Sequence, residues 1–212
     1  MNDGSRPFNN EQIRQLSRAF HQGAAESSAA LKVWLSVGTK VSIDAVEQCP
    51  LEEVTSVLDT TEEAICMCVM EMQGTLTGQM LLAFDDAVGL ALADLVIGRP
   101  LGTSHEWNDL EISSALETMN IAGSAYLNGI ARDLSQRTGE AISLMPLPPV
   151  FLRDFRESLL ETVFIDQAVT GRYAVFAKAA FELEGNPLLW KFLLVPDADS
   201  LARMAEILSR LA

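Results

Sequence analysis

The chain has 212 residues, of which 49% are hydrophobic, and this composition is enough for a sizeable core in one large domain. Its formal net charge is −14 and no cluster of Lys or Arg interrupts the acidic character, so we expect neither nucleic acid nor an anionic membrane as a partner. The first ten residues are polar, and three aspartates interrupt the most apolar stretch, so the sequence predicts no signal peptide and no membrane span.

The first half of the chain predicts a long helix, three strands and a short closing helix. Apolar residues recur at helical spacing, and the later segments are rich in strand-forming residues. A turn at Gly74 separates two of the strands, and Asp85 is a good N-cap for the closing helix. The expected elements are a flexible N-terminus at 1–9, a helix at about 10–38, strands at 39–46, 63–72 and 75–84, and a helix at 85–98.

The second half repeats this order of elements. Its long helix ends in "LSQRTGEAISL", which is similar to "LSVGTKVSI" at the end of the first helix. Each half closes with a hairpin and a helix that begins after Asp, and the segment "MPLPPV" is expected to be an extended lead-in to a strand. The expected elements are a helix at 110–136, strands at 140–145, 159–169, 173–184 and 188–196, and a helix at 199–211.

This duplication predicts the fold class. We expect an α+β fold built from two α-β-β-β-α repeats with pseudo-symmetry, in which long helices cover an antiparallel sheet. The repeats span about residues 10–100 and 105–212, with a connector at 98–105, and together form a single domain over residues 10–212.

The second long helix carries a polar stripe in its middle. At about 100° per residue, four polar side chains fall within an arc of about 60°. They are Ser113, Glu117, Asn120 and Ser124. Ordinary surface helices also have polar faces, and this is the simpler interpretation. An asparagine in mid-helix and a glutamate without Lys or Arg at the next turn favour a surface that contacts another protein.

The neighbouring side of the same helix is apolar and is expected to face the core. This core stripe consists of Leu116, Met119, Tyr126, Leu127, Ile130 and Leu134. Small residues at 122–125 are expected to flank the polar stripe, where they would let a partner approach closely.

The stretch "DLEISSALETMNIAGSAYLNGIA" resembles the signature helix of the CheC/CheX/FliY family, whose members are phosphatases of the chemotaxis response regulator CheY. The family pattern is Asp or Ser, three residues, Glu, two residues and Asn, followed by a later Pro. Ser113, Glu117 and Asn120 match the first three positions, and Pro146 is the nearest later proline, slightly further along than in the family. The resemblance covers nearly the whole chain, since CheC-like proteins are similar duplicated domains.

The resemblance implies hydrolysis of an aspartyl phosphate on a CheY-like receiver in two-component signalling. Asn120 would orient the attacking water, Glu117 would pair with the receiver's lysine, and Ser113 and Ser124 would contribute to docking. No cofactor is expected on this chain, because the receiver would supply Mg²⁺. Whether an activator similar to CheD takes part is left open by the sequence.

The first long helix lacks this pattern. Arg14, Arg18 and His21 stand where the second half has Ser113, Glu117 and Asn120, if the two helix ends are aligned. An arginine would repel the receiver's lysine, so we expect a solvated face, with a second binding surface as the alternative.

Two other functions remain open. One is a non-catalytic scaffold similar to FliM of the flagellar switch, and the other is a generic soluble α+β protein whose motif is accidental, such as a signalling adaptor. Three cysteines, Cys49, Cys66 and Cys68, have no zinc-site spacing, and two histidines are too few for a metal cluster, so we expect buried thiols in a cytoplasmic protein and no metal site. The Met-rich strand at 66–72 is expected to pack in the core.

Overall fold

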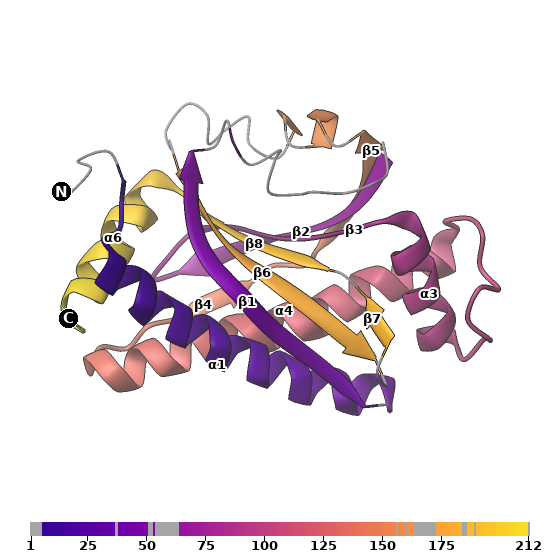
Figure 1. Ribbon diagram of the computed structural model, residues 1–212, viewed down its shortest axis with the longest axis horizontal. Coiled ribbons are helices and arrows are strands. Elements are labelled where there is room, and N and C mark those ends of the chain that lie inside the picture. The colour runs from indigo at the N-terminus through magenta and orange to yellow at the C-terminus, as the bar shows by residue number, and fades with distance from the viewer. Residues whose placement is uncertain are drawn as a thin grey trace.

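The computed structural model describes residues 6–36, 38–50, 53, 64–155, 157–159, 161–162, 173–183, 186–188 and 190–211. Long helices cover one sheet, as Figure 1 shows. The elements are α1 (Asn10–Leu35), β1 (Thr39–Pro50), β2 (Ala64–Gly74), β3 (Gly78–Phe84), α3 (Asp86–Ile97), α4 (Asp109–Thr138), β4 (Leu144–Pro146), β5 (Val150–Phe155), β6 (Tyr173–Leu183), β7 (Asn186–Leu188), β8 (Lys191–Pro196) and α6 (Ala198–Ser209).

The sheet has eight strands in the described part of the chain, and their order reflects the duplication of the chain. The main path runs β1-β6-β8-β3-β2-β4, while β5 also pairs with β2 and β7 pairs with β6. Each half therefore places its first strand beside a strand of the other half, since β1 pairs with β6 and both β4 and β5 pair with β2. The two halves join in the centre, where β3 pairs with β8. This pseudo-symmetric antiparallel arrangement confirms the duplicated α+β fold.

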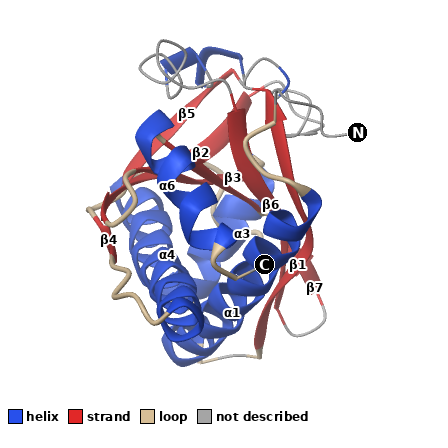
Figure 2. Cartoon of the chain, turned by 90° about the vertical axis from the view of Figure 1, so that its left-hand side faces the viewer, coloured by secondary structure: helices blue, strands red, loops and turns tan. Residues whose placement is uncertain are grey.

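The helices α1 and α4 form a layer against one face of the sheet (Figure 2). The core lies between this layer and the strands. Tyr126 of α4 is in its centre, with its ring 5.9 Å from that of Phe20 in α1 and stacked 5.3 Å from that of Phe192 in β8. Aromatic contacts of this kind add to the free energy of burial. Tyr126 therefore joins both helices to the sheet.

Local sequence signals account for the helix ends. Asn9 and Gln12 form a reciprocal capping box at the start of α1. The N-cap of α6 is Asp197, whose carboxylate accepts a hydrogen bond of 2.8 Å from the backbone N–H of Ser200. Asp85 occupies the N-cap position of α3 as expected, although its side chain forms no capping hydrogen bond within the described residues.

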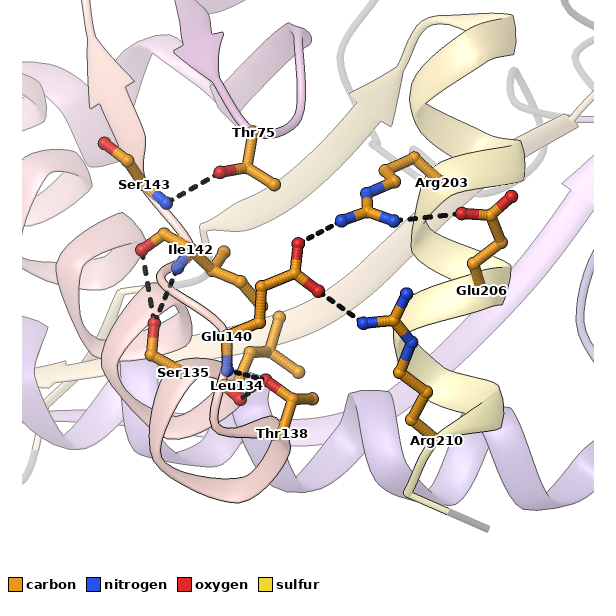
Figure 3. Close-up of polar contacts among 10 residues, drawn as sticks. All are labelled: Thr75, Leu134, Ser135, Thr138, Glu140, Ile142, Ser143, Arg203, Glu206 and Arg210. Carbon is orange, nitrogen blue, oxygen red and sulfur yellow. Dashed lines mark hydrogen bonds and ion pairs between the residues drawn. The ribbon is translucent and has the colours of Figure 1, made fainter.

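The C-terminal end of α4 is fixed to α6 by an ion-pair cluster (Figure 3). The carboxylate of Glu140, just after α4, accepts from Arg203, and its other oxygen accepts from Arg210 at 2.7 Å. The hydroxyl of Ser135 accepts from the backbone N–H of Ile142 at 2.9 Å. These contacts hold the corner between α4 and β4 against the C-terminal helix.

Two segments that follow α4 have different outcomes in the structure. The prediction of a strand at 159–169 is wrong at its start, because the described residues there are helical. The hydroxyl of Thr162 donates to the carbonyl of Ser158, one helical turn earlier. The rest of that segment lies outside the described residues. The extended stretch before Val150 does lead into a strand, β5, as expected.

The expected core positions are confirmed with one exception. The side chains of Cys66, Cys68, Met70 and Met72 are buried in one cluster, as expected for β2. Leu116 is only half-buried. Among the described residues, no helix combines the length and apolar composition that a membrane crossing requires.

Candidate functional site

The polar stripe of α4 lies on the outer side of the helix. Ser113, Glu117 and Asn120 are exposed, and Ser124 is half-buried. The opposite side of α4 is buried, with Met119 and Tyr126 among its core residues. The helix therefore places these side chains together on one accessible face.

Glu117 and Asn120 have no intramolecular partner among the residues that the structure describes. Within the part of the chain that the structure describes, neither side chain forms a hydrogen bond or an ion pair. Nearby polar side chains do have internal partners, since the hydroxyls of Ser114 and Thr118 both donate to carbonyls of the same helix at 2.8 Å. A carboxylate and an amide one turn apart are thus free to bind a partner without breaking an internal contact.

Two glycines hold α4 closely against its neighbours. A β-carbon on Gly123 would lie 2.5 Å from the side chain of Met80 and 3.1 Å from that of Met70. A β-carbon on Gly129 would lie 2.8 Å from the Cα of Gly23 in α1. Close packing on two sides gives the exposed stripe a rigid support, which a positioning site requires.

The small residues around the stripe are placed differently from the expectation. Ala122 and Gly123 are buried and face the core, because α4 needs small residues where it meets the sheet. Ser124 and Ala125 are half-buried and border the exposed face.

The N-terminal end of α4 is held by the connector between the two halves. The buried carboxylate of Asp94 accepts from the backbone N–H groups of Thr103, at 2.8 Å, and Ser104, at 3.0 Å. Burial raises the pKa of Asp94, but hydrogen bonds from the connector outweigh this effect and leave the pKa below its ordinary value. Arg99 pairs with Glu111 of α4 at 2.8 Å. These contacts fix the connector against the first turn of α4.

The contact between the connector and α4, and the exposed leucines beside it, were not predicted from the sequence. Leu101 and Leu110 are 65% and 49% exposed. The sequence did contain a signal for the exposure of Leu110, because this residue falls on the same side of the helical wheel as Glu117. An aspartate inside the apolar stretch "ALADLVIG" was a second signal, because a buried acid needs partners.

The corresponding face of α1 has its charges paired. Arg14 forms an ion pair with Glu11, and Arg18 lies 3.8 Å from Asp133 of α4. The Nδ1 of His21 is 2.7 Å from the carbonyl oxygen of Ser17. These contacts fit the solvated face expected for the first repeat.

No metal site is found in the described ranges, where no three His, Cys, Asp or Glu side chains are grouped closely enough to hold an ion.

No protein-family model and no curated protein matches this sequence. Several solved structures are similar in fold. FliY from Thermotoga maritima matches with a TM-score of 0.74 and 18% identity over 97% of this chain and 99% of that chain. The FliM middle domain from H. pylori matches with a TM-score of 0.64 and 11% identity over 96% of this chain and 99% of that chain.

A chain of the CheX–CheY–BeF₃–Mg²⁺ complex from Borrelia burgdorferi is also similar, with a TM-score of 0.51 and 12% identity over 83% of this chain and 96% of that chain. The resemblance seen in the sequence is thus confirmed at the level of the fold, which is of the CheC/CheX/FliY type.

Proposed function

We propose that this protein is a phosphatase of a phosphorylated CheY-like receiver in chemotaxis signalling. One observation carries the proposal: Glu117 and Asn120 are exposed on the outer face of a rigidly packed helix and have no partner among the described residues. The likeness in fold to a chain of a CheX–CheY–BeF₃–Mg²⁺ complex supports it, because BeF₃ is a mimic of a phosphoryl group.

The reaction requires little from this chain beyond positioning. A water attacks phosphorus in line with the bond to the receiver's aspartate, that bond breaks, and the products are inorganic phosphate and a free carboxylate. The amide of Asn120 can accept from and donate to this water, which holds it in the attacking direction. The proton released by the water is taken up by the phosphate, so no general base of this chain is needed.

Glu117 has a different role in this proposal. Its carboxylate forms a charge-assisted hydrogen bond with the lysine of the receiver site, which sets the register of docking. Because Glu117 and Asn120 are one helical turn apart, fixing the first side chain also fixes the second over the phosphoryl group. Ser113 and Ser124 extend the contact on either side, and the receiver supplies the Mg²⁺.

A second candidate function is a non-catalytic scaffold of the flagellar switch. The observation that favours it is the likeness in fold to the FliM middle domain over 96% of this chain. A scaffold would bind its partner without changing the lifetime of the phosphoryl group.

The decay of a phosphorylated receiver separates these functions. We expect added protein to shorten the lifetime of the phosphoryl group, and Asn120→Ala and Glu117→Ala to abolish this effect while remaining folded by circular dichroism. A receiver that binds the protein but keeps its ordinary lifetime would favour the scaffold.

A further inference from the structure

The polar stripe on α4 is too small to form a complete interface. A specific protein complex buries about 800 Å² on each partner and involves roughly 20–30 residues a side. Glu117 and Asn120 with their two serines supply only a fraction of this area. The docking surface must therefore continue beyond the stripe, and apolar side chains are the usual source of such contact area.

The exposed face of α4 continues towards its N-terminus through Leu110. At about 100° per residue, Leu110 lies within about 80° of Asn120 on the wheel, and about 15 Å separates them along the axis. Leu110 is 49% exposed and is the one exposed large apolar side chain of α4, all of whose residues are described. It lies one turn before Ser113, on the same face.

Leu101 is presented by the connector beside this end of α4. The backbone N–H of Thr103 donates to the carbonyl of Pro100 at 3.2 Å, which closes a turn with Leu101 and Gly102 in the middle. Gly102 has a φ of 82°, as a type II turn requires at its third residue. The turn leaves the side chain of Leu101 65% exposed at its tip.

The connector is held on both sides of this turn by Glu111 of α4. Arg99 donates to Glu111 at 2.8 Å, and the hydroxyl of Ser104 donates to the same oxygen at 3.1 Å. Because both ends of the turn are anchored, Leu101 has little conformational freedom to lose on binding. The anchoring therefore places an exposed apolar tip beside the first turn of α4.

The charge around the two leucines indicates the chemistry of the partner. Glu106, Asp109 and Glu117 are exposed in this region, and no Lys or Arg occurs between residues 100 and 120. Such a surface complements one that has a lysine or arginine next to apolar residues. The receiver lysine that is proposed to pair with Glu117 would supply the positive charge of such a partner surface.

We propose that Leu101 and Leu110 form an apolar docking contact for the same receiver and set the affinity of the complex. This inference rests on the proposed function and extends it to partner recognition. The leucines contact a region of the receiver next to its phosphorylation site, while Asn120 acts on the water. They are positioning residues, and their removal weakens binding without slowing the reaction of the bound complex.

The test uses the double variant Leu101→Ala/Leu110→Ala and titrates it with a receiver activated by beryllofluoride and Mg²⁺. The same variant is then used to measure decay of the phosphorylated receiver over a range of concentrations. We expect the Kd to rise about tenfold, while the decay rate at saturation stays as in the wild type. Met145→Ala is the control, because Met145 is 53% exposed in β4, which follows the C-terminal end of α4, the opposite end from Leu110, and its loss should change neither quantity.

Each outcome distinguishes the inference from the proposed function. An unchanged Kd in the double variant, with an active wild type, overturns the docking contact and leaves the phosphatase intact. A lower saturated rate with unchanged Kd also contradicts it, because the leucines would then act in the chemical step. If the wild type neither binds the activated receiver nor speeds its decay, the proposed function fails and the docking contact fails with it.

Discussion

Gly129 of α4 packs directly against Gly23 of α1. A β-carbon added to Gly129 would lie 2.8 Å from the Cα of Gly23, so the two helices touch backbone to backbone at their crossing. The next nearest atoms are the carbonyl oxygen of Gln22 and the Cγ of Glu26, both at 3.0 Å. Backbone atoms cannot move aside as a flexible side chain can. The separation of the two long helices, and with it the position of the polar stripe, is therefore set at this contact.

Gly129→Ala should destabilise the protein although alanine is the better helix former. Overpacking costs about 1–3 kcal/mol, which exceeds the gain in helix propensity of about 1 kcal/mol. Urea denaturation measures the difference, with Asn128→Ala as the control because Asn128 is the exposed preceding residue. A higher denaturation midpoint for Gly129→Ala would show that the helices are not in close contact.

Asn120→Ala should leave the free energy of unfolding within about 0.5 kcal/mol of the wild type or raise it slightly. Its side chain is exposed and has no partner in the described part of the chain, so the fold loses no contact. The buried neighbour Met119 provides the contrast, since Met119→Ala should cost about 2–5 kcal/mol. A large loss of stability in Asn120→Ala would mean that the amide serves the fold and not a partner.

Asp86, the first residue of α3, should contribute to stability in a pH-dependent manner. Hydrogen bonds from Arg153, and then from Cys66 and Trp107, lower the pKa of Asp86 to about 2. Because this value lies below that of the unfolded chain, about 3.9, the stabilisation is complete above about pH 5. It is lost as the pH falls through 4 towards 2, and screening of the partly exposed pair limits it to about 1–2 kcal/mol.

Urea denaturation between pH 6 and 3 tests this contribution. Asp86→Asn should unfold more easily at pH 6 and lose less stability than the wild type as the pH falls. Asp109→Asn is the matched control, because Asp109 is the first residue of α4 but is exposed and without a side-chain partner in the described chain. Equal pH slopes for Asp86→Asn and the wild type would contradict the assignment.

The three cysteines should be unreactive in the folded protein. Burial raises the pKa of Cys68 to about 12, and burial with nearby Glu53 and Glu47 raises that of Cys49 to about 11. The thiol of Cys66 is also buried, and it donates to Asp86. Since the thiolate is the reactive form, a disulfide reagent at pH 7.5 should label none of them rapidly, and all three after unfolding. Rapid labelling of the native protein would show that a thiol is accessible.

The sequence was most informative where local periodicity decides the structure. The polar and apolar sides of α4 follow directly from its 3.6-residue repeat, so the exposure of Glu117 and Asn120 and the burial of Met119 could be predicted. The aspartate caps of α3 and α6 depend on adjacent residues only and were equally visible.

Long-range relationships could not be obtained in this way. The pairing of β1 with β6 joins residues such as Val41 and Phe181, and nothing local in either strand specifies the partner. Likewise, an apolar run as short as the one at Leu159 fits either a strand or a helix. The structure has a helical turn there. The anchoring of the connector by Asp94 and Glu111 depends on tertiary contacts for the same reason.

The most direct test of the proposed function is the decay rate of a phosphorylated chemotaxis receiver with the wild type, Asn120→Ala and Asn128→Ala. Asn128 is an exposed asparagine on the same face of α4, two turns further on, so it controls for loss of an amide as such. The proposal predicts that the wild type and Asn128→Ala accelerate decay equally. The acceleration by Asn120→Ala should be about 100-fold smaller. Equal decay rates with the wild type and Asn120→Ala, at concentrations where both bind the receiver, would contradict it.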